Sequence, residues 1–535
     1  MYKRAAISFF ALMVVFGLLI ANLGIIGLNL GTSTTSQKSN EKSIVLGTSR
    51  GMIYDYNMKR LVNTDSHNTT VCLPTTSAFN TISEFVTDDE KTDIYENMSN
   101  GQVSIFSTIQ KFDERDIRST DIVDRYSVNQ PCVHLIGHLD ENGDGAIGLE
   151  KAYNSYLSQQ GGEIKAKWSV DALGHILFGE SIKFEKNGYL SPAGIQLTID
   201  VDIQRIAENA LLHHNIGKGA CVVLDAHTSE ILASASIPEF NPLDLSASLQ
   251  NADSPFINRA LTPYTVGSIF KPFVAVSAIE SNIDFSYNCT GSIDVNGTIF
   301  RCNNSTAHGF LNLKTAMEQS CNTYFIALGQ KVGAEKLITL CSSLGFGKGV
   351  ELADNFNLKS GILPSSESIT SPQALANLCF GQGELLVNPV QMAVAYACFA
   401  NGGYYREPTL MKGIVDKNGE IIQKVHLPQK YRVLNDSTIN RIDDILESVV
   451  SNGNASKAYS EIVTNHGKTA TAQSGWFENS REITHTWFCG YFTHNNKTYV
   501  VVIFKEDGTS GAVDCAPVFK EISENIVENI VKIES

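Results

Sequence analysis

The segment Ser268-Ile-Phe-Lys271 decides how the rest of this chain is interpreted. It opens the apolar run Ser268–Ile279, in which Pro272 falls in the first turn, where the missing N–H costs little. We therefore predict a helix over this run. Residues three apart share one face of a helix, so Lys271 could reach the hydroxyl of Ser268. The positive end of the helix dipole would also favour a developing alkoxide at Ser268.

Two further motifs follow Ser268–Lys271 along the chain, in the order that one class of enzyme requires. One class of serine acyl-enzyme needs Ser-x-x-Lys, Ser-x-Asn and Lys-Thr/Ser-Gly. The second motif is Ser320-Cys321-Asn322, between helical patterns at 311–319 and 323–332, and a turn there would aim both polar side chains into one cleft. The third is Lys468-Thr469-Ala470 in the strand-like run 466–472.

Each motif is short, and the chain contains other matches by chance: Ser39-x-x-Lys42, Ser127-x-Asn129, Ser286-x-Asn288 and Lys314-Thr315-Ala316. A lone Ser-x-x-Lys is more often part of a solvated surface helix. A lone Ser-x-Asn is more often a helix cap, and a lone Lys-Thr an ordinary edge strand. Order and context together therefore carry the prediction of a serine acyl-enzyme.

The pattern around these motifs predicts an α+β fold. Strands are expected at 220–225 and 231–236 and again at 486–493 and 499–505, with helical patterns between the two pairs and a final helix at 516–533. Strands at both ends of one segment favour a single domain whose sheet joins those ends.

The amino terminus predicts a membrane anchor. Residues 5–28 are apolar apart from Ser8 and Asn22, long enough to cross a ~30 Å hydrocarbon layer as a helix. Lys3 and Arg4 precede them, so the positive-inside rule places residues 1–4 in the cytoplasm and the rest of the chain outside. The alternative is a cleaved signal peptide, but its apolar region is usually shorter and ends in a small-x-small site.

Charge and cysteine content exclude some functions. The net charge of −15 over 535 residues argues against a nucleic-acid partner, which needs a basic surface. The spacing of the 11 cysteines resembles no zinc site, so no metal or cofactor is expected and most are predicted to be buried. Cys289 and Cys302 flank an Asn-Gly turn, and a hairpin there could pair them in a disulfide or leave two thiols.

Longer segments carry a family resemblance. Ser49-Arg-Gly-Met-Ile-Tyr-Asp55, Gly148-Leu-Glu-Lys-Ala-Tyr153, Phe380-Gly-Gln-Gly383 and Asn388-Pro-Val-Gln-Met-Ala393 stand with the three motifs. With these segments the chain resembles the monofunctional, short form of class B penicillin-binding proteins over almost its whole length. No glycosyltransferase region intervenes, unlike in class A members.

The resemblance implies the domain organisation. An anchor at 5–28 and a linker at 29–48 would precede an elongated, non-catalytic pedestal (dimerisation-like) domain at 49–180. A transpeptidase domain at 195–535, with a central antiparallel sheet and helices, would complete the chain.

The resemblance also implies residue roles. Ser268 would attack the carbonyl of a penultimate D-alanine, with Lys271 as the base. Burial and the second cation Lys468 would keep Lys271 neutral. Ser320 would relay a proton to the leaving amine, and Asn322 would bind a peptide amide.

Three positions of the Lys468 strand would bind substrate: Thr469 and Thr471 its carboxylate, with Ala470 between them. The backbone N–H groups of Ser268 and Thr471 would form the oxyanion hole. Ala470 stands where the family usually has glycine, and its methyl could crowd the acyl-enzyme. Val266 likewise replaces a common proline.

The function expected from the resemblance is peptidoglycan cross-linking outside the cell membrane, with covalent inhibition by β-lactams that makes the enzyme an antibiotic target. Stem peptides would be the substrates, and a glycan polymerase of the SEDS family the partner. Elongation (cell shape), division and sporulation are not distinguished. A β-lactamase or β-lactam sensor, and a catalytically weak scaffold, are the alternative readings.

Overall fold

The computed structural model describes Phe9 and residues 13–21, 41–171, 173–177, 181–478 and 480–534. Residues 13–21 are helical, and within these ranges we find no helix long and apolar enough to traverse a bilayer. The expected cytoplasmic tail, the rest of the expected anchor at 5–28 and the linker up to residue 40 lie outside the described residues. From residue 41 onward the chain forms two compact units.

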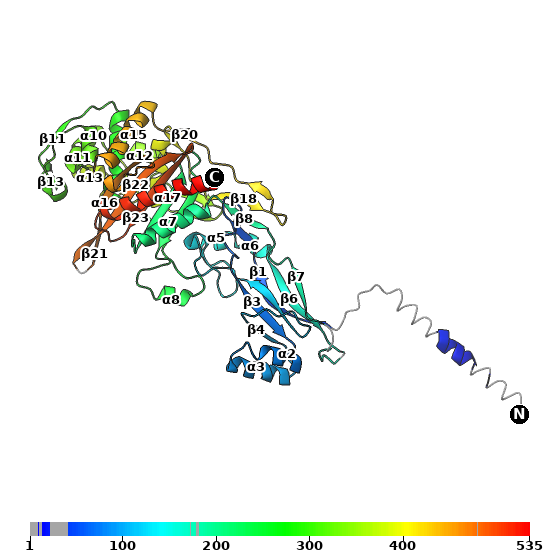
Figure 1. Cartoon of the computed structure of the whole chain (residues 1–535). Helices are drawn as coiled ribbons and strands as arrows, with labels where there is room; N and C mark the ends of the chain where they lie inside the picture. Colours follow the sequence, from blue (N-terminus) through cyan, green and yellow to red (C-terminus); the bar gives the residue numbers. More distant parts are fainter. Residues whose placement is uncertain are drawn as a thin grey trace. The chain divides into compact units, whose positions relative to one another are not determined.

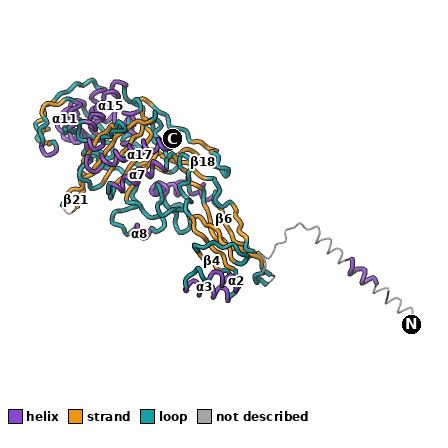
Figure 2. The backbone as a smooth tube through the Cα atoms, viewed as in Figure 1, coloured by secondary structure: helices purple, strands orange, loops and turns teal. Residues whose placement is uncertain are grey.

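The first unit consists mainly of Ser66–Ile122 and Glu163–Asn187, together with residues 41–48. One of its sheets has the order β1-β6-β7 and the other the order β4-β3-β5. Helices α2 and α3 lie next to each other (Figure 2), and both contribute to a small apolar core with Ile117 of β5. The bounds are β1 (Glu41–Ser49), β3 (Ser66–Cys72), α2 (Thr76–Ile82), α3 (Asp88–Ser99), β4 (Ser104–Ser107), β5 (Ile117–Val123), β6 (Gly162–Ser169) and β7 (Lys183–Asn187).

Strand β1 occupies the end of the range expected to be a linker, 29–48. Its composition is polar, but β6 hydrogen-bonds to it along the sheet edge. A partner strand more than a hundred residues away overrides the local signal, because backbone pairing depends little on side-chain polarity.

The second unit contains Ser49–Asp65 and Val123–Gly162 besides Gly188–Ser535, so the range 49–180 is divided between the two units. The reason is non-local pairing. Strand β2 (Met52–Tyr54) runs parallel to β8 (Gly194–Leu197) in a four-stranded sheet of order β19-β18-β8-β2. The buried Glu150 carboxylate also accepts hydrogen bonds from the Nε atoms of Arg50 and Arg125, at 2.8 and 2.7 Å. The Arg50 contact joins the segments beginning at Ser49 and Gly148, both of which carry the family resemblance.

The central sheet of the second unit is five-stranded and antiparallel, with the order β10-β9-β23-β22-β21. Leu224 of β9 pairs with Val500 of β23, so the early and late strands share one sheet, as the sequence predicted. The predicted strands are confirmed, with β22 longer than expected. Their bounds are β9 (Gly219–Asp225), β10 (Ile231–Ile237), β21 (Asn465–Glu478), β22 (Arg481–His494) and β23 (Lys497–Lys505).

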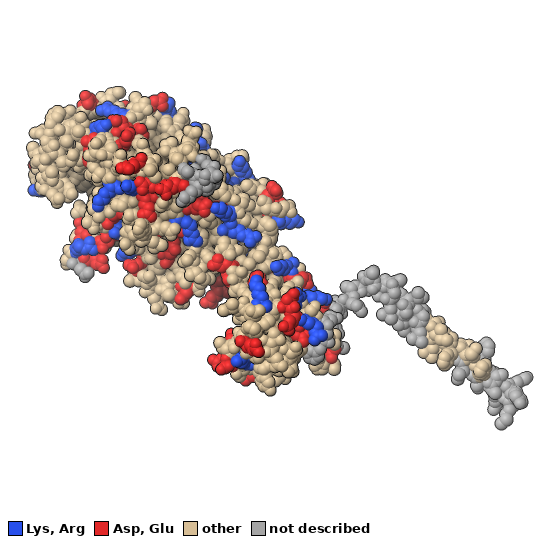
Figure 3. Space-filling model, in the orientation of Figure 1, with Lys and Arg blue, Asp and Glu red and all other residues tan. Residues whose placement is uncertain are grey.

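Helices cover both faces of this sheet. Helix α14 (Pro389–Ala400) packs on β9, β22 and β23. Helices α7 (Val201–His213) and α17 (Ala516–Glu534) pack on each other and on strands of the same sheet, in front of it in Figure 1. All seven residues of β9 are buried as a result. On the face drawn in Figure 3, Lys and Arg side chains are interspersed with Asp and Glu and form no extended basic surface.

The other helices and strands of the second unit surround this core. Their bounds are α4 (Val133–Ile136), α5 (Gly148–Ala152), α6 (Asn154–Gln159), α8 (Leu245–Leu249), η1 (Gly267–Phe270), α9 (Lys271–Glu280), β11 (Tyr287–Cys289), β12 (Ser292–Val295), β13 (Thr298–Arg301), η2 (Asn303–Ser305), β14 (Gly309–Leu311), α10 (Leu313–Glu318), α11 (Asn322–Val332), α12 (Ala334–Ser343), β15 (Val350–Ala353), β16 (Phe356–Leu358), α13 (Pro372–Cys379), β17 (Tyr404–Tyr405), β18 (Met411–Val415), β19 (Ile421–Lys424), β20 (Tyr431–Arg432), α15 (Asp436–Ser451), η3 (Ser456–Ala458) and α16 (Gly511–Asp514).

Candidate active site

Ser268 lies in the tight turn η1, and the α-helix α9 begins only at Lys271. The helix predicted from Ser268 therefore starts with one turn of 3₁₀ geometry. Gly267 enters this turn with φ +60°, and a Cβ there would lie 3.0 Å from the Cβ of Ala472 in β21. Glycine is required because both the backbone conformation and the close approach to β21 exclude a side chain. The turn thus holds Ser268 beside the edge strand of the sheet.

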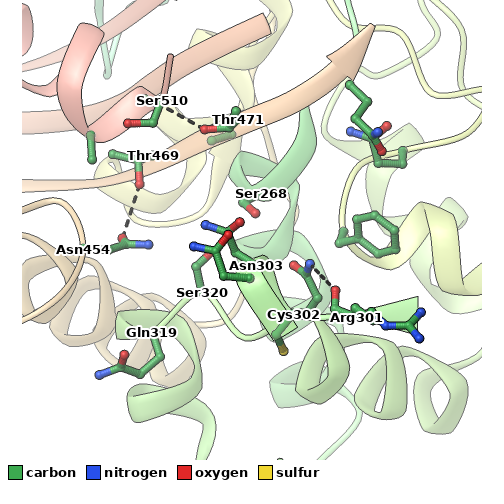
Figure 4. Close-up of a pocket in the computed structure, with 18 of the residues that line it drawn as sticks. Ser268, Arg301, Cys302, Asn303, Gln319, Ser320, Asn454, Thr469, Thr471 and Ser510 are labelled. Atoms are coloured by element: carbon green, nitrogen blue, oxygen red, sulfur yellow. Dashed lines mark hydrogen bonds between the residues drawn. The ribbon is translucent and has the colours of Figure 1, made fainter. Parts of the chain in front are cut away.

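Ser268 opens into a pocket of about 600 Å³ (Figure 4). Five of the other predicted site residues also line it: Ser320, Asn322, Thr469, Ala470 and Thr471. Lys271 and Lys468 are completely buried and bond to Ser320 at the pocket wall. All eight predicted residues, spread over two hundred positions of sequence, therefore meet at one site.

The two lysines converge on the Ser320 hydroxyl. The Nζ atoms of Lys271 and Lys468 each lie 3.0 Å from its Oγ. Lys271 also donates to the Ser320 carbonyl and to the Oδ1 of Asn322, both at 2.7 Å. Ser320 thus links two amines, as a proton relay requires.

Burial keeps these lysines from being ordinary cations. Removal from water lowers the pKa of Lys271 to about 7, against an opposing effect of Cys321 and Cys302. Burial and the charge of Lys271 hold the pKa of Lys468 well below its usual range. Both amines contact the same Ser320 hydroxyl, and among the described residues no carboxylate bonds to either of them. Protonation of one amine therefore disfavours protonation of the other.

The predicted contact between Lys271 and the hydroxyl of Ser268 is not formed. Within the described part of the chain that hydroxyl has no side-chain hydrogen bond, because Lys271 is directed to Ser320 and Asn322. In ligand-free sites such bonds are often long and tighten only when substrate binds. The hydroxyl is consequently free to receive a ligand.

The Ser320–Asn322 turn is held at several points. Ser320 adopts a left-handed conformation with φ +52°, which a non-glycine residue keeps only when its surroundings fix it. Cys321 caps α11 and accepts a hydrogen bond from the N–H of Tyr324. The Asn322 amide accepts from Lys271 and donates to the carbonyl of Arg301 at 3.0 Å, which fixes its orientation.

Strand β21 forms the opposite wall of the pocket. Thr469 donates to the Oδ1 of Asn454 at 3.3 Å, and Thr471 accepts from the N–H of Gly511 at 3.4 Å (Figure 4). Ala470 is only 3% exposed and packs in the main apolar core. Its methyl therefore takes little of the pocket surface, and the crowding expected from it is much reduced.

Several lining residues were missed by the sequence reasoning. Gln382, Asn454 and Ser510 face the same pocket. Gln382 follows Gly381, whose carbonyl accepts from the N–H of Gly267 at 2.8 Å. In the sequence, the Phe380–Gly383 segment stands out only through the family resemblance, and its glycines are the available signal of a close backbone approach.

The other motif matches lie elsewhere in the chain. In the described ranges, neither Ser127-x-Asn129, nor Ser286-x-Asn288, nor Lys314-Thr315 lines the pocket. The cysteines can be compared with the sequence-based expectations. All 11 cysteines are buried and unpaired, so the prediction of burial is confirmed. Cys289 and Cys302 form no disulfide, with their sulfurs 3.7 Å apart.

Two curated relatives resemble this chain in sequence. It is 30% identical over 406 residues to stage V sporulation protein D of Bacillus subtilis, covering 72% of this chain and 60% of that protein. It is 28% identical over 440 residues to the peptidoglycan D,D-transpeptidase FtsI homolog of Mesostigma viride, covering 75% and 72%. The chain thus spans less than two thirds of the length of the first relative.

The fold is also known from solved structures. A chain from "Structural coordination of polymerization and crosslinking by a peptidoglycan synthase complex" superposes with a TM-score of 0.69 at 24% identity, covering 97% of this chain and 98% of that one. Residues 219–524 match the family described as "Penicillin binding protein transpeptidase domain", within the range 195–535 expected for such a domain. Because this match covers more than half of the chain, the protein belongs to the transpeptidase family of penicillin-binding proteins.

Proposed function

We propose that this chain is a peptidoglycan D,D-transpeptidase that forms peptide cross-links through an acyl-enzyme on Ser268, and that β-lactams acylate the same hydroxyl. The observation that carries the proposal is the convergence of two buried lysines on Ser320 beside Ser268. The family match and the name of the Mesostigma viride relative support the reaction class.

Acylation needs a base for Ser268. A neutral Lys271 amine takes the hydroxyl proton as Ser268 Oγ attacks the carbonyl of the penultimate D-alanine. The peptide C–N bond then breaks, and the leaving amine receives a proton through Ser320, which Lys468 also contacts. Attack by the amine of a second stem peptide releases Ser268 and forms the cross-link. A β-lactam opens its ring amide along the same path and stops at the acyl-enzyme.

The pocket walls suggest how a stem peptide is held. Asn322 offers an oriented amide, and its neighbour Lys271 fixes which end faces the ligand. Thr469, Ala470 and Thr471 present an edge strand to which an extended ligand can add, with the threonine hydroxyls for its carboxylate. The backbone N–H groups of Ser268 and Thr471 would form the oxyanion hole, and removing one such donor typically costs about 10²–10³ in rate.

We further propose the arrangement in the cell. The apolar residues 5–28 after Lys3 and Arg4 would anchor the chain in the membrane once, with the amino terminus in the cytoplasm and the catalytic domain outside. Residues 49–180 would serve as a pedestal, with the transpeptidase domain at 195–535. A structural neighbour from a peptidoglycan synthase complex supports a glycan polymerase of the SEDS family as partner.

The two alternatives make different demands on the same pocket. A β-lactamase or sensor would share the motifs but would not need the Arg50 and Glu150 segments, which bind each other here. Rapid turnover of a chromogenic cephalosporin would favour a β-lactamase. A scaffold without catalysis would not need two buried lysines around one serine, since burying such groups costs stability.

The test is to label the full-length chain with a fluorescent penicillin and map the modified peptide by mass spectrometry. We expect one adduct, on Ser268, and none in the Ser268→Ala variant. Ser286→Ala is the matched control, because Ser286 belongs to a chance motif outside the pocket and is exposed. An adduct on Ser320, or full labelling of Ser268→Ala, would overturn the assignment.

A further inference from the structure

Three cysteines and a histidine gather on the far side of the Ser320–Asn322 turn. Cys289, Cys302, His308 and Cys321 each offer one ligand atom, and all four atoms lie within 4.8 Å of one another. The three cysteines are buried and His308 is half-buried. Figure 4 shows the sulfur of Cys302 directed away from Ser268.

The local fold brings these four positions together. Strand β11 ends at Cys289 and pairs with β14, so that Cys289 lies opposite Gly309, next to His308. The β12–β13 hairpin returns the chain to Cys302, whose N–H bonds to the carbonyl of Gly291 at 3.0 Å. Cys321 joins from the start of α11. Four separate segments of the chain thus each supply one ligand, which is why the cysteine spacing predicted no metal site.

The distances match a tetrahedral thiolate site. Zinc binds sulfur at about 2.3 Å and imidazole nitrogen at about 2.0–2.1 Å, so two ligands on a tetrahedron lie roughly 3.5–3.8 Å apart. The sulfur of Cys302 is 3.7 Å from those of both Cys289 and Cys321. The Nδ1 of His308 is 3.4 Å from the sulfur of Cys289. The two sulfur–sulfur separations are too long for disulfides. All three distances fit ligands around one ion, and every pair of the four ligand atoms lies within 4.8 Å.

Donors around the sulfurs favour thiolates. The Thr323 hydroxyl, itself fully buried, lies 3.2–3.6 Å from all three sulfurs. The N–H groups of Gly291 and Tyr324 each point at a sulfur from 3.4 Å. Hydrogen bonds of this kind orient metal ligands from outside the coordination sphere.

We propose that Cys289, Cys302, His308 and Cys321 form a structural zinc site that holds the active-site turn. The ion would tie Cys321, between Ser320 and Asn322, to Cys302. Cys302 directly follows Arg301, whose carbonyl accepts from Asn322. The metal therefore fixes both ends of the contact that orients the Asn322 amide. Four protein ligands leave no open position, so the ion takes no part in the reaction itself.

Metal content tests the site independently of activity. We expect about one zinc ion per chain in the full-length protein purified without added metal, measured by inductively coupled plasma mass spectrometry. Cys289→Ser and His308→Ala should each lose most of it, whereas Cys398→Ser should retain it, because Cys398 is buried in α14 outside the cluster. Thr323→Val, which removes only the hydroxyl, should weaken zinc binding about 10–100-fold.

A second measurement needs no variant and covers the case in which a ligand variant does not fold. The unaltered chain loaded with Co²⁺ in place of zinc should show the intense visible bands of a tetrahedral thiolate site. Chelation should slow penicillin acylation, by about tenfold if one oriented hydrogen bond is lost, and added zinc should restore it. A metal-free chain with a disulfide among the three cysteines, four free groups without metal, or another metal in stoichiometric amount would overturn the assignment to zinc.

Discussion

Two groups of buried ionisable side chains flank the same turn, and they differ in how their charge is managed. On the pocket side, Lys271 and Lys468 share the Ser320 hydroxyl, and within the described part of the chain no acidic side chain is bonded to either amine. On the other side, three thiols and an imidazole face one another. Burial without a counter-charge lowers the pKa of an amine, so that it is neutral at a lower pH and can accept a proton, which suits proton transfer. Buried thiols with convergent lone pairs can instead share a cation, which suits a structural role. The reactive lysines and the proposed structural site thus lie on opposite sides of the Ser320–Asn322 turn.

The largest effect is expected from Lys271→Ala. General-base catalysis typically contributes about 10²–10⁴ in rate, so penicillin acylation should fall by at least that order. Stopped-flow or gel-based acylation rates measure it, with circular dichroism to verify the fold. Lys314→Ala, in a chance motif outside the pocket, should acylate normally. Normal acylation by the Lys271 variant would mean that another group is the base.

The dependence of the acylation rate on pH should report the titration of the buried lysines. Because burial lowers the pKa of Lys271 to about 7, its neutral form prevails above that pH, and the acylation rate should rise with pH through this region. Burial and the charge of Lys271 hold the pKa of Lys468 well below its usual range, while Cys302 and Cys321 oppose the downward shift of the Lys271 pKa. A flat profile between pH 6 and 8, roughly one unit on either side of that value, would contradict the assignment.

Asn322→Ala should sharpen the comparison, because this amide touches both sides of the turn. It loses the bonds from Lys271 and to Arg301, and we expect acylation to slow by about 10–100-fold, since two hydrogen bonds worth about 0.5–1.5 kcal/mol each are lost. Zinc content should stay unchanged, because no ligand is removed. Loss of metal together with the rate would show that the two groups cannot be separated.

The smallest effect is expected from Ala470→Gly. Its methyl is buried in the core, so removing it should change acylation by less than about threefold with small or bulky β-lactams. Glycine within a strand costs about 0.5–1 kcal/mol, which should appear as a slightly lower thermal midpoint. A clear gain in rate with the bulky compound alone would show that the methyl crowds the ligand after all.

The sequence by itself determined the reacting groups and the class of fold. Ser268, Lys271, Ser320, Asn322 and Lys468 were chosen from motif order and helical spacing, and they do line or adjoin one pocket. Strands β9 and β23, near the two ends of the domain in sequence, were predictable because they are continuous apolar runs between polar turns. Such signals are local, and local signals survive without a structure.

Only the tertiary structure decided which atoms meet. Strand β1 and the division of residues 49–180 depend on pairing with distant strands, for which no periodicity exists in the sequence. The orientation of Lys271 toward Ser320 and the burial of the Ala470 methyl follow from packing around β21. The four-ligand cluster is the clearest case, because its ligands Cys289, Cys302, His308 and Cys321 come from four separate segments. Hairpin register and the start of a helix bring these segments together. The spacing of the ligands along the chain does not contain that geometry.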